Sequence, residues 1–439
     1  MAWPAFANAA VAFVPIKPDP PVINIFTKCP YKNFLCGEGP PLMTREKVRT
    51  RSRKSECCAS LASPFRQAHA AIMNAASYTV CFYCADQNLH RDRSRGITHY
   101  TRELLAHLRD TKLANLVALT SKSSFAVPEG IEQIVLPFAS DWLPGRLVAD
   151  HLHPLIAPRI EADIWHYPKG FLPMGFQVKA KKVGSVADVM LQRDADHHPE
   201  SRPRAAFAYW LAMLRHSLAR LDLVVTLTEF SRQDILRFCD RHRIKAPPIV
   251  VGYVGVSVSD LSLPTVPAKG DYVLHLASHL PHKATEWLLE QWTRLSELTP
   301  SLPELRLVGT LPESAMPRLA KMKNVRFMPP LPRQELGEMM AGARGLLLPS
   351  EIEGFGIPAV EAYLLGTPVA YVRETAVEEV LGSETPGGFH RDFDSFRAAL
   401  AEVLNLDRVA ILQKGMELGE RFTWENCVRR TVAAYANVL

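Results

Sequence analysis

Residues 346–370, LLLPSEIEGFGIPAVEAYLLGTPVA, decide the fold of this chain. The three leucines at 346–348 form an apolar run, which predicts the end of a buried strand. The Glu-Gly-Phe-Gly loop at 353–356 needs backbone torsions that glycine adopts without strain. Pro358 suits the first turn of a helix because it has no N–H to lose, and Gly366 suits the position just after the last turn. The stretch therefore predicts a strand, a glycine loop, a short helix and a second strand.

This loop and the start of its helix form a geometry that suits a diphosphate. The first turn of a helix exposes backbone N–H groups, the helix dipole adds partial positive charge, and Gly356 lets phosphate oxygens come close. Glu361 follows one turn into the helix and faces the loop, so its carboxylate can accept both hydroxyls of a ribose. Glu353, at the loop entrance, can meet a sugar beyond the diphosphate. The alternative is two surface glutamates beside a structural turn, which the register of Gly356, Pro358 and Gly366 disfavours.

Short apolar runs alternate with helical stretches along the rest of the chain. Strands are predicted at 78–85, 116–119, 131–137, 163–167, 183–186 and 223–227, and again at 272–277, 305–309, 325–328, 345–349 and 369–372. Helices are predicted at 99–108, 204–220, 232–238, 285–298, 334–341 and 358–365, with a glycine loop at 96–98 and a capping box from Ser231 to Asp234. Prolines and glycines between 247 and 270 predict a linker. The pattern is that of two doubly wound α/β domains, and ligands usually bind in the cleft between such domains.

The composition excludes several classes of protein. The chain has 439 residues, 47% hydrophobic and 22% charged, which excludes a wholly disordered chain and is typical of two or three domains. No run reaches the roughly 18 uncharged apolar residues of a spanning helix. A net charge of +6 is too dilute for a nucleic-acid-binding surface. The eight cysteines are sparse, as in a reducing cytosol, and we interpret Cys81 and Cys84, in a predicted strand, as buried structural thiols rather than a metal or redox pair.

Two segments have more than one interpretation. Residues 1–76 have no stable period, contain a basic run at 45–54, and lack the positive start of a secretory signal. We interpret them as a flexible tail, as a basic arm that contacts acidic lipid, or as sequence upstream of a true start at Met73. The predicted helix at 204–220 either rests in a lipid headgroup layer or packs its apolar face inward as an ordinary domain helix.

Several motifs together resemble glycosyltransferase family four, the retaining GT-B enzymes also called group one glycosyl transferases. Residues 353–361 resemble the E-x7-E motif of that family. GITHYTRELLAHL (96–108) resembles the family's glycine loop and helix, and VVTLTEFSRQDI (224–235) resembles its V-S-E-F-S strand and helix. VRFMPPLPRQELGEMMAGARGLLLPS (325–350) resembles its nucleotide-side strand and helix, and RFTWENCVRRTVAAY (421–435) resembles its closing helix. The similarity covers about residues 78–439, and residues 1–76 have no counterpart in the family.

The resemblance implies a role for each matched residue. Glu353, Lys283 and Asp188 are the implied catalytic residues: the glutamate lies near the transferred sugar, and the lysine neutralises the leaving diphosphate. The implied donor-binding residues are Glu361 at the ribose, the backbone of Phe355, Gly356 and Ile357 at the diphosphate, and Ser278, Gly96 and Thr98 in loops that face the donor. The family works without a bound metal, so no metal ligands are implied.

The resemblance also implies an α/β fold of the GT-B class, in which two Rossmann-like doubly wound domains face each other across a cleft. Residues 1–76 are then an N-terminal extension, 77–250 the acceptor domain and 251–415 the nucleotide-sugar donor domain. Residues 416–439 are expected to form a C-terminal helix that crosses back to the first domain.

The expected function is the retaining, metal-independent transfer of mannose or a similar hexose from GDP-mannose or a UDP-sugar. The expected acceptor is a glycan or a lipid-linked glycan in surface polysaccharide or lipopolysaccharide biosynthesis, with no further cofactor and no nucleic-acid partner. We expect the chain in the cytoplasm, with peripheral contact to the inner face of the plasma membrane. One alternative is a catalytically degenerate sugar-nucleotide-binding protein, because Ala187 and Ser278 stand where the family often has histidine and arginine. Another is an isomerase or epimerase on a related two-domain fold.

Overall fold

A computed structural model of the chain describes residues 78–87, 95–157, 159–175, 177–199, 203–258, 269–299, 301–311 and 315–439. All of them belong to one compact unit that spans residues 60–439. The predicted N-terminal extension, residues 1–76, lies outside the described residues.

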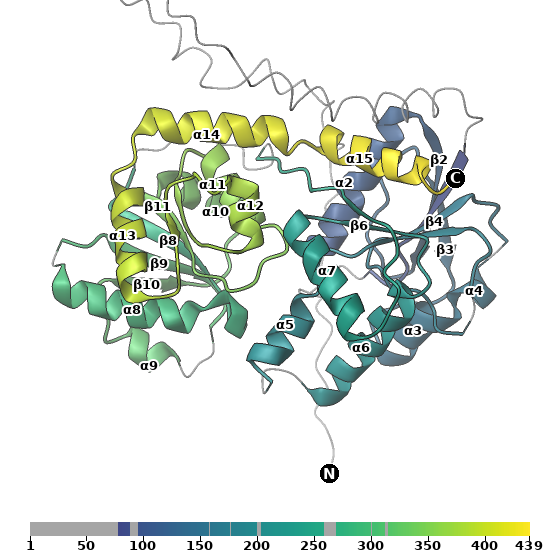
Figure 1. The fold of residues 1–439 in the computed structure, drawn as a ribbon, viewed down its shortest axis with the longest axis horizontal. Coiled ribbons are helices and arrows are strands. Elements are labelled where there is room, and N and C mark those ends of the chain that lie inside the picture. Colours follow the sequence, from purple (N-terminus) through teal and green to yellow (C-terminus); the bar gives the residue numbers. More distant parts are fainter. Residues whose placement is uncertain are drawn as a thin grey trace, which may run out of the picture. The chain divides into compact units, whose positions relative to one another are not determined.

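Two parallel sheets form the framework of the described residues (Figure 1). The first has the strand order β3-β2-β1-β4-β5-β6-β7, and the second has the order β10-β9-β8-β11-β12-β13. The strands of the first sheet are β1 (Tyr78–Tyr83), β2 (Ala114–Ser121), β3 (Glu132–Leu136), β4 (Ile164–Tyr167), β5 (Lys181–Ser185), β6 (Leu223–Thr226) and β7 (Ile249–Val251). Those of the second are β8 (Tyr272–Ala277), β9 (Glu304–Gly309), β10 (Val325–Met328), β11 (Gly345–Leu348), β12 (Val369–Val372) and β13 (Gly388–Phe389). Both orders reverse direction beside their first strand, which is the doubly wound arrangement.

Helices form most of the crossovers that join the parallel strands, except between β2 and β3 and between β4 and β5, where the described residues contain no helix. In the first domain they are α2 (Arg95–Thr111), α3 (Leu143–Leu147), the π-helix η3 (Val148–Leu152), α4 (His153–Ile156), α5 (Met190–His197), α6 (Arg204–Leu218) and α7 (Glu229–Arg241). The second domain has the 3₁₀ turn η5 (Pro281–Lys283), α8 (Thr285–Leu298), α9 (Met316–Leu319), α10 (Arg333–Gly342), α11 (Ile357–Leu364), α12 (Ala376–Leu381) and α13 (Phe393–Leu404). Two further helices, α14 (Arg408–Arg421) and α15 (Trp424–Ala436), end the chain.

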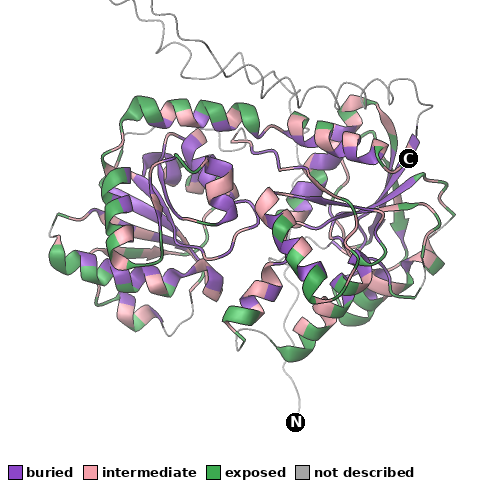
Figure 2. Ribbon diagram, in the orientation of Figure 1, coloured by how far each residue is buried: buried purple, intermediate pink, exposed green. Residues whose placement is uncertain are grey.

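The central strands of both sheets are buried almost throughout (Figure 2), because helices cover both faces of a doubly wound sheet, whereas the outer strands β3, β7 and β10 are partly exposed. β1, with the sequence YTVCFY, pairs with β2 on one side and β4 on the other. Cys81 and Cys84 are both buried and carry free thiols, as expected for structural cysteines. Burial raises the pKa of the Cys81 thiol far above its usual range, so that sulfur stays protonated.

The C-terminal helix packs against the first domain, as the sequence predicts. α15 contacts α2, β6 and β7, and Figure 1 shows α15 beside α2. A hydrogen bond of 2.5 Å joins the Tyr435 hydroxyl to Nδ1 of His166 in β4, and Tyr435 meets Tyr78 edge to face. The two-domain architecture with a returning helix is the GT-B arrangement, which confirms the predicted fold class.

Several predicted boundaries differ from the structure. The capping box at Ser231 is wrong, because Thr228 caps α7 by accepting the Ser231 N–H, and the helix begins at Glu229. The predicted glycine loop at 96–98 lies inside the first turn of α2. The predicted linker at 247–270 contains β7, the edge strand of the first sheet.

The chain end also differs from its prediction. The single predicted C-terminal helix is two helices, α14 and α15, that break at Phe422 and Thr423. None of the helices in the described part of the chain is long and apolar enough to span a bilayer.

Candidate active site

The predicted strand, glycine loop and helix are present as β11, the loop at 353–356 and α11. Gly356 caps α11 with φ 87° and ψ 46°, a left-handed conformation that favours glycine. A Cβ atom at Gly356 would lie 2.7 Å from Cγ2 of Val377 in α12, so the position also lacks room for a side chain. Pro358 lies in the first turn, and Gly366 follows the helix with φ 75°. The loop therefore fixes the position of the backbone N–H groups in the first turn of α11.

Glu361 is buried on α11 and forms a two-pronged ion pair with Arg333, the first residue of α10. Both guanidinium NH₂ groups donate to the carboxylate, with Nη1 3.1 Å from Oε2 and Nη2 2.5 Å from Oε1. The carboxylate is 6% exposed as a residue, whereas the arginine side chain is 41% exposed. A planar arginine pair fixes the orientation of a carboxylate. Sequence reasoning missed Arg333, because nothing in the motif points to a partner on another helix.

Lys283 and Glu353 form the second ion pair of the site. Lys283 Nζ lies 2.6 Å from Glu353 Oε1, and both side chains are half-buried. The lysine ends the short turn η5, and Ala284 follows it with a left-handed φ of 52°. A non-glycine residue in that region stores backbone strain, which is common in functional loops. The structure thus brings together two candidate catalytic residues 70 positions apart in sequence.

Ser278 shapes the loop that presents Lys283. Its hydroxyl oxygen accepts the N–H of Leu280 at 3.2 Å, and its own N–H donates to the Thr285 hydroxyl oxygen at 3.2 Å. These two hydrogen bonds close the turn between β8 and α8. The role of Ser278 that is visible here is to position the loop.

Asp188 approaches the same cluster from the first domain. It follows β5, and its Oδ1 accepts the N–H of Met190 at 2.9 Å. A Cβ atom on Gly354 would lie 2.7 Å from Oδ2 of Asp188, so the carboxylate rests directly against that glycine. Burial raises the pKa of Asp188; Glu353 raises it further, while Lys283 and the Met190 N–H lower it. All three candidate catalytic residues therefore lie close enough to interact.

Helix α7 holds the loop from the side of the first domain, through contacts that sequence reasoning did not predict. The hydroxyls of Thr228 and Ser231 donate to the carbonyl oxygen of Gly354 at 3.1 and 3.2 Å. The carboxylate of Glu379 in α12 accepts the N–H groups of Glu229 and Phe230 at 2.8 and 2.6 Å. The two contacts join the domains at the start of α7. Residues 228–231, T-E-F-S, stood out in the sequence by their resemblance to the family's V-S-E-F-S segment, but the sequence did not predict that they bond to Gly354 and Glu379.

A buried histidine adds a third contact between the domains. His282, in η5, lies with Nδ1 3.2 Å from Oδ1 of Asp194 in α5, and both side chains are buried. Burial lowers the pKa of His282, with Lys283 adding to the effect and Asp194 opposing it. The contact fixes η5, and with it the residue next along the chain, Lys283.

The other predicted donor-binding residues divide into two groups. The Phe355 ring packs into the core against Phe422, at 5.1 Å between ring centroids, which leaves only its backbone for a ligand. Gly96 and Thr98 lie on α2 in the first domain, and the described hydrogen bonds do not join them to Lys283, Glu353 or Asp188. Thr98 is buried, and its hydroxyl has no partner among the described residues.

Within the described ranges no group of three or more His, Cys, Asp or Glu side chains could hold a metal ion.

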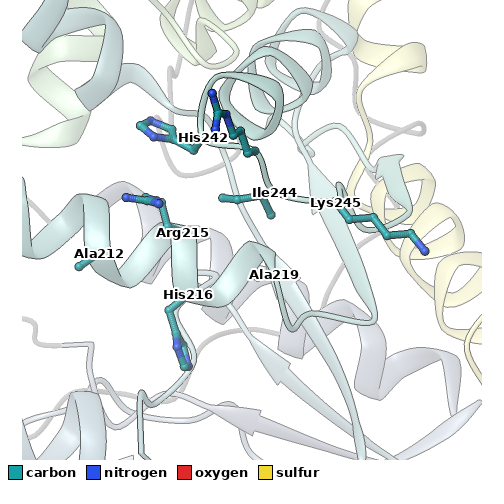
Figure 3. A pocket seen from close by; sticks show the side chains of 8 residues that line it. Ala212, Arg215, His216, Ala219, His242, Ile244 and Lys245 are labelled. Carbon is teal, nitrogen blue, oxygen red and sulfur yellow. The ribbon is translucent and has the colours of Figure 1, made fainter.

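A separate hollow lies in the first domain between α6 and the end of α7 (Figure 3). Its volume is about 440 Å³, and it shares no residue with the candidate site. It is lined by Ala212, Arg215, His216, Ala219, His242, Arg243, Ile244 and Lys245.

Comparisons with known proteins found similarity to glycosyltransferases. Residues 270–406 match the family model described as glycosyl transferases group 1. O-antigen chain mannosyltransferase B of Escherichia coli is 27% identical over 292 residues, which are 62% of this chain and 74% of that protein. MMP alpha-(1->4)-mannosyltransferase of Mycolicibacterium hassiacum is 26% identical over 284 residues, which are 55% of this chain and 64% of that protein.

Solved structures show the same fold at low sequence identity. Sucrose-phosphate synthase from Thermosynechococcus elongatus superposes with a TM-score of 0.61 at 17% identity, over 82% of this chain and 98% of that one. A glycosyltransferase involved in lipopolysaccharide biosynthesis superposes with a TM-score of 0.58 at 17% identity, over 80% and 98%.

Proposed function

We propose that this chain, a family-four glycosyltransferase with the GT-B fold, transfers a hexose, in the first place mannose, from a nucleoside diphosphate sugar. We propose a glycan or lipid-linked glycan as the acceptor, transfer with retention of configuration, and a role in surface polysaccharide or lipopolysaccharide synthesis at the cytoplasmic side. Support for mannose comes from two relatives that are named as mannosyltransferases. Support for the pathway comes from the names of an O-antigen enzyme and a structural neighbour.

The observation that carries the proposal is the convergence of Lys283, Glu353 and Asp188 beside the start of α11. The lysine is held 2.6 Å from one carboxylate, and the second carboxylate rests against Gly354 in the same loop. A cation and the start of a helix suit the negative charge of a diphosphate, and acidic side chains can accept hydrogen bonds from the hydroxyls of a sugar. We therefore assign the diphosphate to the loop at 353–357 and the hexose to the acidic side.

The chemical step requires a leaving group whose negative charge grows as the glycosidic bond breaks. Lys283 and the backbone N–H groups of residues 355–357 can stabilise that charge, and one such donor contributes about 3–4 kcal/mol at the transition state. The acceptor hydroxyl then bonds to the anomeric carbon from the face that the diphosphate leaves. Its proton passes to an oxygen of the departing diphosphate, so the bond formed and the bond broken share one face.

Glu361 and Arg333 complete the donor site in this proposal. The ion pair fixes the plane of the carboxylate, and its two oxygens have further lone pairs that can accept the ribose hydroxyls. A carboxylate that is already oriented loses less freedom when the nucleotide binds. Arg333 is a positioning residue in this scheme, since it acts through Glu361.

A panel of sugar nucleotides tests the proposal. We expect release of nucleoside diphosphate and transfer of sugar with one donor, and loss of both with Glu361→Ala or Lys283→Ala. Activity is expected to persist in excess chelator, because the charge is stabilised by Lys283 and backbone N–H groups. If both variants keep the wild-type kcat/KM, the site is wrong; if a chelator abolishes activity and metal restores it, the metal-independent step is wrong. Tight donor binding without turnover would favour the degenerate sugar-nucleotide-binding protein instead.

A further inference from the structure

A helical segment of the first domain has its large apolar side chains on the outside. α3, η3 and α4 follow one another without a gap over residues 143–156. The residues that face inward are Gly145, Ala149 and His153, all buried. Tyr83 contacts two of them: its hydroxyl donates to the Ala149 carbonyl at 2.5 Å, and its ring stacks on His153 at 3.8 Å. We call residues 142–156 the outward apolar segment, after the side chains on its other face.

The exposed side chains of this segment are large and apolar. They are Trp142 (59% exposed), Leu143 (69%), Leu147 (44%), Leu152 (40%), Leu155 (59%) and Ile156 (38%). Leu143 and Leu147 are four residues apart, as are Leu152 and Ile156, so each pair lies on one helical face. Six of the twelve large hydrophobic residues that are exposed in the described chain fall within these fifteen positions. Such concentration marks a surface that contacts something other than water.

Helix α6 lies alongside the outward apolar segment and supplies positive charge. The Tyr209 hydroxyl donates to Oδ2 of Asp150 at 2.8 Å and lies 3.1 Å from Nε2 of His151, which joins the two elements. The large apolar residues of α6 are buried or half-buried, which agrees with an ordinary domain helix, while Arg204 and Arg215 are exposed. Residues 203–220 contain no acidic residue.

The acidic residue within the segment is already paired. Asp150 is the single acidic residue between positions 142 and 157, and it accepts from Tyr209 and pairs with Arg146 at 3.5 Å. The net charge of the segment and α6 together is therefore positive. An apolar surface bordered by arginines is complementary to an anionic membrane.

The hollow between α6 and the end of α7 adds Arg243 beside Arg215. Arg215, His216, His242, Arg243 and Lys245 line it, and its lining contains no acidic residue. Figure 3 shows Arg215 and His242 on opposite walls of the hollow, whereas Lys245 points away from it. Burial lowers the pKa of both His216 and His242, and nearby arginines lower it further, so the charge of the hollow comes from its arginines. Arginine donors suit the phosphodiester of a lipid headgroup.

We propose that the outward apolar segment and α6 form a docking surface for an anionic lipid bilayer. The leucines and Trp142 enter the interface between headgroups and acyl chains, and Arg204 and Arg215 contact lipid phosphates. Tyr83, which the segment covers, ends β1, and ligands of doubly wound sheets bind beyond the carboxyl ends of the strands. Under the proposed function, docking here brings a lipid-linked acceptor to the first domain; the docking itself does not depend on that function.

Flotation of the full chain with vesicles tests this surface. We expect binding to an equal mixture of phosphatidylcholine and phosphatidylglycerol, and little binding to phosphatidylcholine alone. The double variant Leu143→Ser with Leu155→Ser should bind the mixture at least about tenfold more weakly, because each leucine loses its apolar transfer. The double variant Arg204→Gln with Arg215→Gln should lose roughly fivefold for each arginine and become less sensitive to salt. The matched control is Leu298→Ser with Val409→Ser, two exposed apolar residues of the second domain (61% and 51% exposed).

The outcomes are separable because all substituted side chains are exposed, and circular dichroism with thermal melting checks that each variant folds. Unchanged vesicle binding by the leucine variant overturns the proposal. Vesicle binding through the basic run at 45–54 would persist in both the leucine and the arginine variant, and that result overturns the proposal as well. Absence of vesicle binding by the wild type also overturns it. A dimer that the leucine variant loses in sedimentation would instead assign this surface to a second copy of the chain. Loss of donor turnover with intact vesicle binding would contradict the proposed function alone.

Discussion

Replacement of Lys283 by methionine tests the charge that the chemical step requires. Methionine keeps most of the length and apolar character of the lysine side chain but removes its charge. Nζ lies 2.6 Å from Glu353, with the lysine side chain 29% exposed and the glutamate 13% exposed. A partly exposed pair of this kind contributes at most about 1 kcal/mol to folding. The loss of a cation at the leaving diphosphate costs about 3–4 kcal/mol at the transition state, or roughly 100- to 1,000-fold in kcat.

The assay is release of nucleoside diphosphate at saturating donor, together with the free energy of unfolding from urea titration. Lys283→Met should lower kcat by that factor while it leaves the free energy of unfolding within about 1 kcal/mol of wild type. The matched control is Lys414→Met, because Lys414 also pairs with a glutamate, Glu417, at 3.0 Å, but on α14. A folded Lys283→Met protein with kcat within tenfold of wild type would refute the reasoning. A kcat loss that is matched by the control would refute it as well.

Three further predictions concern the ribose, the glycine loop and pH. Arg333→Gln should raise the donor KM about tenfold and reduce the discrimination against a 2′-deoxy donor, because Glu361 loses its orienting partner; equal discrimination in both proteins would exclude that role. Gly356→Ala should lower the free energy of unfolding by about 1–3 kcal/mol, since its φ of 87° and the contact with Val377 both oppose a Cβ atom; an unchanged urea midpoint would contradict this. Burial raises the pKa of Asp86 to about 6, so the folded state favours the protonated carboxyl. Its contribution to stability is therefore present at low pH and falls by about 3 kcal/mol as pH rises from about 4 to about 6; Asp86→Asn should remove that dependence in urea titrations, and identical pH profiles would refute it.

Local patterns were sufficient for most of the fold. α8 occupies the predicted span 285–298, and the strands at 272–277, 325–328 and 369–372 have the predicted bounds. These elements are read from apolar periodicity, which depends on neighbours along the chain. The edge strand β7 was missed because prolines at 247 and 248 precede it and its three residues are only half-buried.

The contacts of the candidate site could not be derived in the same way. The pair of Lys283 and Glu353 joins residues 70 positions apart, and the pair of Arg333 and Glu361 joins residues 28 apart. Neither separation leaves a periodic signal, because long-range contacts depend on how the sheet aligns its loops. Thr228 shows the same limit: its role as the cap of α7 depends on where the strand before it ends. The loop and helix pattern supplied both glutamates as candidates, the family resemblance supplied the lysine, and the geometry supplied Arg333.

The contacts of Gly354 explain how the first domain can influence the proposed diphosphate site in the second. The carbonyl oxygen of Gly354 accepts the hydroxyls of Thr228 and Ser231, so that oxygen points toward α7. The described chain contains no cis peptide bond, and in a trans peptide the carbonyl and the following N–H point in opposite directions. The N–H of Phe355 is therefore turned away from α7. Because a buried carbonyl holds its orientation through such bonds, the two hydroxyls set the direction of a backbone donor that neither of them touches.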